Sequence, residues 1–147
     1  MIHRMPGRLR VAAFLLCGFS LRAAAQPTAL AGDDLQRAFA ASFALVPEVA
    51  KFIAVPACRQ HGQQAAEVAR ARDKGMTQAA ALELLAPPAS TSRQPGDKRI
   101  DAAVTHANTA IAAYVFGPSR PSPELAIAIV NGACLLGART TIGQIGV

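Results

Sequence analysis

Two cysteines and two histidines beyond the N-terminal segment are the residues of this 147-residue chain best suited to chemistry. Cys58 and His61 are one helical turn apart, whereas His106 and Cys134 follow much later. Two thiolates and two imidazoles form the ligand set of a structural zinc site. These intervals are far longer than compact zinc modules use, and His106 lies about 200° around a helix from Val104, away from the apolar residues. We therefore expect no metal ligand in this set and a solvated or capping role for each histidine.

The start of the chain predicts a different chemistry for the cysteines. A basic segment ending at Arg10, an apolar segment 11–21 and Ala23-Ala24-Ala25 have the order of a signal peptide with a small-x-small cleavage site. We expect cleavage after Ala25 and export to the periplasm or the exterior. Only Cys58 and Cys134 then remain, and in an oxidising compartment they are predicted to form a disulfide. A bridge that closes so long a loop contributes roughly 4 to 5 kcal/mol to stability.

No other group of residues has the spacing of an active site. Serines, histidines and nine acidic residues form chance triads in many chains, and none here has a local signature. Glu67, Asp73 and Glu83 are expected on solvated helix faces. The glycines are isolated and form neither a phosphate loop nor a dinucleotide fingerprint. We expect no catalytic residue, no cofactor and a function other than catalysis.

The net charge of the chain comes mostly from the leader. Removing residues 1–25 takes four of the 15 basic residues and none of the 9 acidic ones, which leaves 11 basic and 9 acidic residues. A charge this small, spread along the chain, does not form the basic stripe of a nucleic-acid-binding protein. With Tyr114 as its one tyrosine and no tryptophan, the chain also has little aromatic surface for stacking bases.

Apolar residues at intervals of three to four predict helices throughout the mature chain. Alternation of period two, which would indicate strands, is absent over any useful length. The fold class is therefore predicted as all-α, a small bundle of about four to five helices with one disulfide. The stripes are Leu35, Phe39, Phe43 and Val46; the small residues Gly62, Ala65 and Ala69; and Ile100, Val104, Ala107, Ile111 and Tyr114, with Asp101, Thr105 and Asn108 turned away.

The N-terminal helix has an uncertain end in the sequence. After a flexible start at 26–32, Asp33 or Asp34 is suited to cap it. Pro47 then either kinks one long helix or opens a second short one. In the second case the new helix presents Val49, Phe52 and Ile53.

Further boundaries follow from capping residues. Pro56 is predicted to start the next helix, Gly75 to end it, and Thr77 to cap a short one. The last helix is predicted from Ser122, its N-cap, to Gly137, its stop. Its apolar side chains point in all directions, so we expect it to be largely enclosed.

The mature chain, 26–147, is predicted to be a single helical domain. Residues 87–98 contain three prolines and no apolar periodicity, which indicates an exposed linker. The tail 138–147 has three polar breaks and two glycines, so it is expected to fray or to lie extended.

The order of these features resembles a loose group of small exported proteobacterial helical proteins of unknown function with two cysteines. The likeness covers about 58–134. It consists of a cysteine in a helix, Ala-Arg-x-x-Gly at 71–75, an aromatic-Gly-Pro break, present here as Tyr114-Val115-Phe116-Gly117-Pro118, and a terminal helix ending in cysteine. The resemblance implies export, helices and the disulfide, and it carries over no active-site residue.

These features favour a periplasmic or secreted binding or accessory module that acts through contacts with another protein. The alternative is a membrane-surface or stress-protective protein that exposes the apolar segments 35–55 or 125–136. An enzyme of unknown type ranks third.

Overall fold

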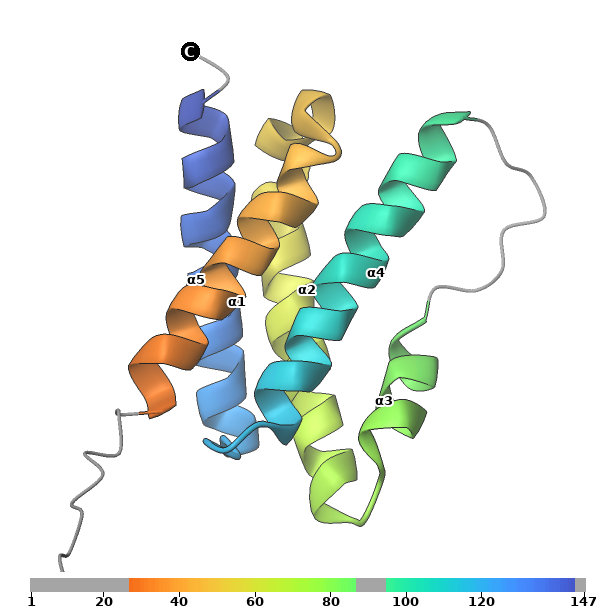
Figure 1. Cartoon of the computed structure of the whole chain (residues 1–147), viewed down its shortest axis with the longest axis vertical. Coiled ribbons are helices and arrows are strands. Elements are labelled where there is room, and N and C mark those ends of the chain that lie inside the picture. The colour runs from red at the N-terminus through yellow and green to blue at the C-terminus, as the bar shows by residue number, and fades with distance from the viewer. Residues whose placement is uncertain (1–26, 87–94, 145–147) are drawn as a thin grey trace, which may run out of the picture.

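The structure is a computed structural model that describes residues 27–86 and 95–144, and within these ranges it has five α-helices and no strand. In Figure 1, α1 and α5 run upward, α2 and α4 run downward, and the short α3 lies beside the lower part of α4. The predicted all-α bundle is therefore confirmed. The proposed signal peptide, 1–25, lies outside the described residues. The helices are α1 (Pro27–Ala44), α2 (Pro47–Asp73), α3 (Gln78–Leu85), α4 (Pro95–Phe116) and α5 (Pro123–Gln144).

Helix α5 packs along both α1 and α2 and joins them into one core. Its Ala126 and Val130 are fully buried. The predicted disulfide links Cys58 of α2 to Cys134 of α5, with 5.4 Å between the Cα atoms and a sequence separation of 76. The Cα distance lies within the range of about 4.4 to 6.8 Å that a disulfide spans. Two helices that are distant in the sequence are thus fixed side by side.

Two glycines let α5 approach its neighbours closely. A Cβ atom on Gly62 would lie 3.1 Å from the carbonyl oxygen of Ile127, so α2 and α5 pack closely at this glycine. A Cβ atom on Gly137 would lie 2.7 Å from the backbone nitrogen of Ala40 and also from the carbonyl oxygen of Gln36 in α1. The prediction that Gly137 ends the last helix is wrong, because this glycine is a contact point inside α5.

The predicted enclosure of α5 is correct for only one side of the helix. The side that faces α1 and α2 is buried, whereas Leu125, Ile127 and Leu136 are exposed large apolar residues. Helix α5 packs against α1 and α2, so the rest of its circumference faces solvent. Because the apolar pattern of α5 runs all round, some large apolar side chains remain at the surface.

The boundaries of the first two helices differ from the prediction. Helix α1 begins at Pro27, ahead of Asp33 and Asp34, so the flexible start at 26–32 is wrong from residue 27 onward. Pro47 opens a separate helix, and α2 then continues through Pro56, which therefore does not start a helix. Pro56 is exposed, so the carbonyl group that loses its backbone donor lies on the solvent side of the helix, where proline is tolerated best.

The capping signals at Ser122, Thr77 and Gly75 were predicted correctly. The Ser122 hydroxyl accepts a hydrogen bond from the Leu125 amide at 3.3 Å, and the Thr77 hydroxyl accepts one from the Ala80 amide at the same distance. Gly75 has φ +95° and ends α2, since its amide donates to the Arg72 carbonyl at 2.8 Å. This is the left-handed position at a helix end that favours glycine.

The linker and the tail are more helical than predicted. Helix α4 already begins at Pro95, so the last four residues of the predicted linker 87–98 are helical, and 87–94 lie outside the described residues. Helix α5 continues to Gln144, so most of the predicted frayed tail 138–147 is helix. The Thr141 hydroxyl donates to the carbonyl oxygen of Ala40 at 3.0 Å, which ties this last part of α5 to α1. Residues 145–147 lie outside the described part.

Two buried polar side chains hold the helix connections. Asn108, predicted to face away from the core, is only 3% exposed and donates to the carbonyl oxygen of Leu85 at 2.7 Å. It thereby satisfies one of the free carbonyl groups at the end of α3. Arg72 is also buried and donates to the carbonyl oxygens of Val115 at 2.7 Å and Pro121 at 3.0 Å, on both sides of the α4–α5 connection.

Candidate functional site

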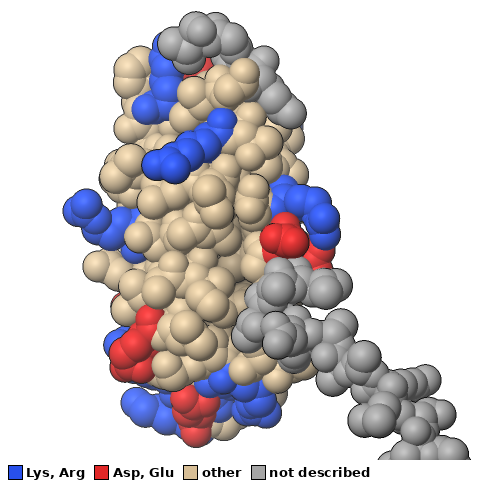
Figure 2. Space-filling view, turned by 90° about the vertical axis from the view of Figure 1, so that its left-hand side faces the viewer, with Lys and Arg blue, Asp and Glu red and all other residues tan. Residues whose placement is uncertain are grey.

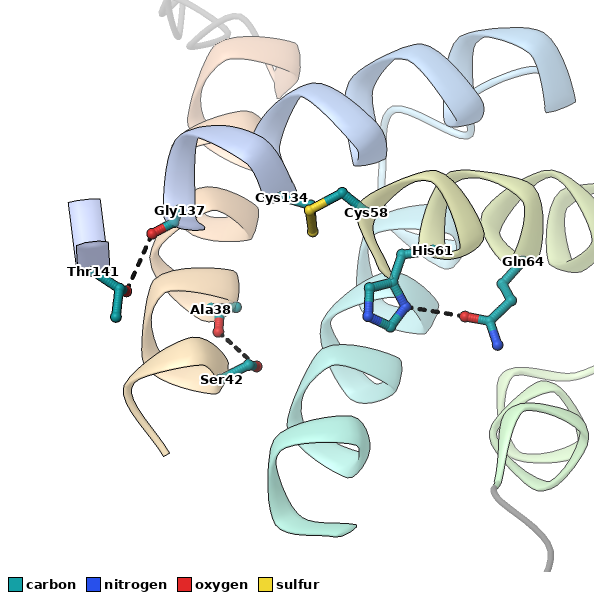
Figure 3. Close-up of a disulfide and its surroundings, with 8 residues drawn as sticks. All are labelled: Ala38, Ser42, Cys58, His61, Gln64, Cys134, Gly137 and Thr141. Carbon is teal, nitrogen blue, oxygen red and sulfur yellow. Dashed lines mark hydrogen bonds between the residues drawn. A yellow bond between two sulfur atoms is a disulfide. The ribbon is translucent and has the colours of Figure 1, made fainter. Parts of the chain in front are cut away.

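The set of cysteines and histidines considered from the sequence is only partly brought together. Cys58 and Cys134 are bonded to each other, so neither offers a thiolate. His61 lies one turn from Cys58, and its Nδ1 is 3.0 Å from Oε1 of Gln64 (Figure 3). His106 is exposed on α4. In the described part of the chain, no group of three or more His, Cys, Asp or Glu side chains is placed to hold a metal ion.

The acidic residues considered from the sequence do not converge on a site. Glu67 and Glu83 are exposed on α2 and α3. Asp73 accepts hydrogen bonds from Nε and Nη2 of Arg72, at 2.9 Å and 2.7 Å. Its carboxylate therefore supports the buried guanidinium group that fixes the α4–α5 connection.

An apolar groove lies where the end of α1, the first part of α2 and the first part of α4 meet. It has a volume of about 240 Å³. Helix α1 contributes three residues, α2 and α4 contribute four each, and the lining contains one titratable group, His61. The lining residues are Phe39, Ser42 and Phe43 of α1; Val46, the N-cap of α2; Val49, Ile53, Ala57 and His61 of α2; and Ile100, Ala103, Val104 and Ala107 of α4.

The polar groups in the lining of the groove are already engaged. The Ser42 hydroxyl donates to the carbonyl oxygen of Ala38 at 2.9 Å. The His61 ring packs against Phe39, with 5.4 Å between the ring centroids, and its Nδ1 pairs with Gln64. Burial lowers the pKa of His61, and the hydrogen bond with Gln64 opposes that effect in part. The neutral imidazole is thus favoured, and the lining is suited to an apolar occupant.

Large apolar side chains continue outward from the groove. Phe52 has 73% of its surface exposed, more than any other large apolar residue described, and it neighbours the lining residue Ile53. Single exposed apolar residues are common on soluble proteins, but a group around a groove is typical of a contact surface. We call this group the apolar rim; it consists of the exposed lining residues Val49, Ile53 and Ile100 together with Phe52.

A second cavity, of about 360 Å³, lies between α1 and the end of α4. Tyr114 and Ser119 line it, and burial raises the pKa of Tyr114. The hydroxyl groups of both residues are buried and lack a hydrogen-bond partner among the described residues. Because these oxygens are hidden from solvent, they cannot contact a molecule in the cavity as it stands, so the apolar groove is the better candidate.

The sequence revealed only one edge of the groove. Val49, Phe52 and Ile53 were expected to be presented together after Pro47, and they are. The opposite edge, formed by Ile100 and Val104 of α4, was assigned to a buried stripe, yet Ile100 is 48% exposed. The available signal was the excess of apolar residues in segment 45–56, which carries more of them than one buried helix face requires.

Comparison of the chain with known protein families, with curated proteins and with solved structures finds no match.

Proposed function

We propose that this protein is a periplasmic or secreted binding or accessory module that acts through contact with another protein chain. The observation that carries the proposal is the apolar groove together with its apolar rim. A partner chain that covers this surface removes several large apolar side chains from water, and that burial is the main driving force of protein association.

The size of the groove favours a protein side chain over a small molecule. Pockets that bind drug-sized ligands measure about 300 to 1,000 Å³, whereas the groove measures about 240 Å³. A groove of this size has room for one large apolar side chain. In protein interfaces such anchor side chains contribute most of the binding free energy, while the surrounding rim excludes water.

Export is supported by the N-terminal sequence and by the disulfide. Disulfides persist in oxidising compartments and are rare in the cytosol. The signal peptide 1–25 lies outside the described residues, so its removal is tested directly: the intact mass of protein isolated from the cell envelope or the medium should correspond to a chain that begins at Gln26. A mass that includes 1–25 would contradict cleavage and favour an anchored protein.

A membrane-surface role is the second candidate, and one observation favours it. Figure 2 shows the side of the molecule on which α5 and the start of α1 lie in Figure 1, and the centre of this face has few charged side chains. The exposed Leu125, Ile127 and Leu136 belong to α5. This helix is long and apolar enough to cross a membrane by length and composition, a criterion that packed core helices also meet.

Site-specific photo-crosslinking in the native cell envelope separates the two candidates. A benzophenone amino acid replaces Ile100 at the rim of the groove, and the matched control replaces Leu84, an exposed apolar residue on α3. We expect a protein adduct, identified by peptide mass spectrometry, at position 100 and none at position 84. Lipid adducts at position 100 would favour the membrane-surface role. Absence of a protein adduct there would refute the proposed function.

A further inference from the structure

The second cavity has walls formed by two helices and one turn. Helices α1 and α4 pack against each other (Figure 1) and provide its apolar sides, among them Leu35 and Ala110. The third wall is the turn 117–120, which is closed by a hydrogen bond from the Arg120 amide to the Gly117 carbonyl oxygen at 3.2 Å. The second cavity and the apolar groove share no lining residue, so the two can be tested separately.

Two hydroxyl groups in the lining have unused hydrogen-bonding capacity. The Tyr114 side chain is only 5% exposed, and neither its hydroxyl nor that of Ser119 has a hydrogen-bond partner among the described residues. An unpaired buried hydroxyl costs free energy, so the large majority of buried polar groups in proteins are paired. Because both residues line the cavity, a molecule held there lies close enough to pair with them after a small local movement.

The turn is the wall that can move. Arg72 donates to the carbonyl oxygens of Val115 and Pro121, which fixes the chain before and after the turn. Between these two points Arg120 is exposed and has φ +37°, a conformation that is unfavourable for a residue with a side chain. Strained backbone of this kind is concentrated at ligand-binding and switching segments. A shift of the turn therefore has little to lose in backbone energy.

A shift of the turn is also what gives access to the hydroxyl groups. Ser119 belongs to the turn, and Tyr114 lies in the last turn of α4 directly before it. Both oxygens are hidden from solvent in the conformation described, so an occupant reaches them only when the turn opens. Hydrogen bonds to the occupant then satisfy groups that are unpaired in the closed form, and this stabilises the open form.

We propose that the second cavity binds a small uncharged molecule with an apolar body and one hydroxyl or carbonyl group, which pairs with Tyr114 and Ser119. A ligand carbonyl oxygen accepts from both hydroxyls, and a ligand hydroxyl accepts from one and donates to the other. This site goes beyond the proposed function and does not depend on it.

The lining sets the size and the charge of the ligand. The volume of about 360 Å³ lies at the lower end of the range of about 300 to 1,000 Å³ for small-molecule pockets. Asp34 is the single charged residue of the lining, and it forms an ion pair with Arg37. The lining thus has no cation for an anionic ligand, and its one carboxylate is already paired. An uncharged ligand fits both observations.

Tyr114 itself reports whether a molecule binds. It is the single tyrosine of a chain without tryptophan, so the tyrosine absorption and fluorescence bands come from this side chain alone. Cyclohexanol is the probe, added to the oxidised chain 26–147. We expect a saturable shift of the tyrosine absorption band, with a dissociation constant on the order of 1 mM for so small a molecule. Cyclohexanecarboxylate, which has the same ring and a negative charge, should give no saturable shift.

Three variants that keep Tyr114 locate the site. Ser119→Ala removes one of the two hydroxyls and should raise the dissociation constant about tenfold. Ala38→Leu fills the cavity from α1 and should abolish binding. Ala41→Leu makes the same change at an exposed position of α1 outside the cavity and should leave the dissociation constant unchanged. Circular dichroism of each variant checks that the helices are intact.

Tyr114→Phe distinguishes a hydroxyl that binds a ligand from one that only supports the fold. Removing an unpaired buried hydroxyl relieves its cost, so the variant should unfold at the same temperature as the wild type or at a higher one. Cyclohexanol should raise the unfolding temperature of the wild type, because it binds the folded chain, and this rise should be lost in the variant.

Three results would overturn the inference. The first is a tyrosine absorption band that does not respond to cyclohexanol in a saturable way. The second is a dissociation constant that Ala38→Leu leaves unchanged. The third is a Tyr114→Phe variant that unfolds below the wild type, because the hydroxyl would then already be paired in the folded chain. The crosslinking result at position 100 is independent of all three, so failure here leaves the proposed function standing.

Discussion

Gly137 and Gly132 form a matched pair for testing how α5 packs. Both lie inside α5, and replacing a helical glycine with alanine stabilises an exposed helix by up to about 1 kcal/mol. No atom lies within 4 Å of a Cβ atom at Gly132, so Gly132→Ala should gain this amount. At Gly137 the added Cβ would lie 2.7 Å from backbone atoms of Gln36 and Ala40, and a backbone cannot turn aside as a flexible side chain does.

The cost at Gly137 follows from this contact. Separating α1 and α5 enough to admit a methyl group is an overpacking change that costs roughly 1 to 3 kcal/mol. It also strains the hydrogen bond between Thr141 and Ala40, which contributes about 1 kcal/mol. After the gain in helix propensity, Gly137→Ala should lower the free energy of unfolding by about 1 to 3 kcal/mol.

Urea unfolding followed by circular dichroism measures both variants. With an m value of about 1 to 3 kcal/mol per M, the midpoints of the two variants should lie roughly 1 to 2 M apart, on opposite sides of the wild type. A Gly137→Ala midpoint at or above that of the wild type would show that α1 and α5 do not approach each other as described.

Three further changes test the bridge, the helix connection and the groove. Replacing Cys58 or Cys134 with alanine should lower stability by about 2 to 5 kcal/mol, with each single variant equal to the double variant; thiol labelling of the unfolded, unreduced chain 26–147, which lacks Cys17, should find no free thiol. Arg72→Met leaves two buried carbonyl groups without their donor and should lower the free energy of unfolding in urea by about 3 kcal/mol. Arg72→Lys should recover little of this loss, because a single ammonium group does not reproduce the planar, multiple-donor geometry of the guanidinium group. Burial lowers the pKa of His61 in the folded chain below its ordinary value of 6.5. The unfolded chain therefore binds the His61 proton more tightly than the folded chain does, so the free energy of unfolding should fall as the pH drops from 6.5 toward the folded pKa. His61→Gln should flatten this pH dependence between about pH 7.5 and pH 5, while the control His106→Gln should keep it. A His61→Gln profile equal to those of the wild type and of the control would refute the assignment to His61.

The sequence by itself determined that the chain is helical and where some of the helices begin and end. Capping depends on atoms a few residues apart, so Ser122, Thr77 and Gly75 could be assigned without tertiary structure. The disulfide could also be predicted, since Cys58 and Cys134 would be the two cysteines left after cleavage of the proposed signal peptide, and two cysteines have one way to pair. Buried stripes such as Phe39 and Phe43 followed from periodicity alone.

The candidate site was predictable only in part. The apolar residues after Pro47 marked one edge of the groove, because their number exceeds what one buried face requires. Its other edge consists of residues about fifty positions later, at Ile100 and Val104. A local pattern indicates that a residue faces another part of the protein. It does not indicate which helix lies there, or whether that helix fills the space completely.

Tertiary structure alone decided the roles of several residues that local rules misassigned. Local rules predict that Gly137 ends a helix. In the structure it lies inside α5, at the point where the backbone of α1 comes so close that only glycine fits. Local rules predict that Asn108 faces solvent. In the structure it is buried and donates a hydrogen bond to the carbonyl group of Leu85. In both cases a contact between distant parts of the chain outweighs a local preference of about 1 kcal/mol, because close packing and buried hydrogen-bonding groups cost more than that when they are left unsatisfied.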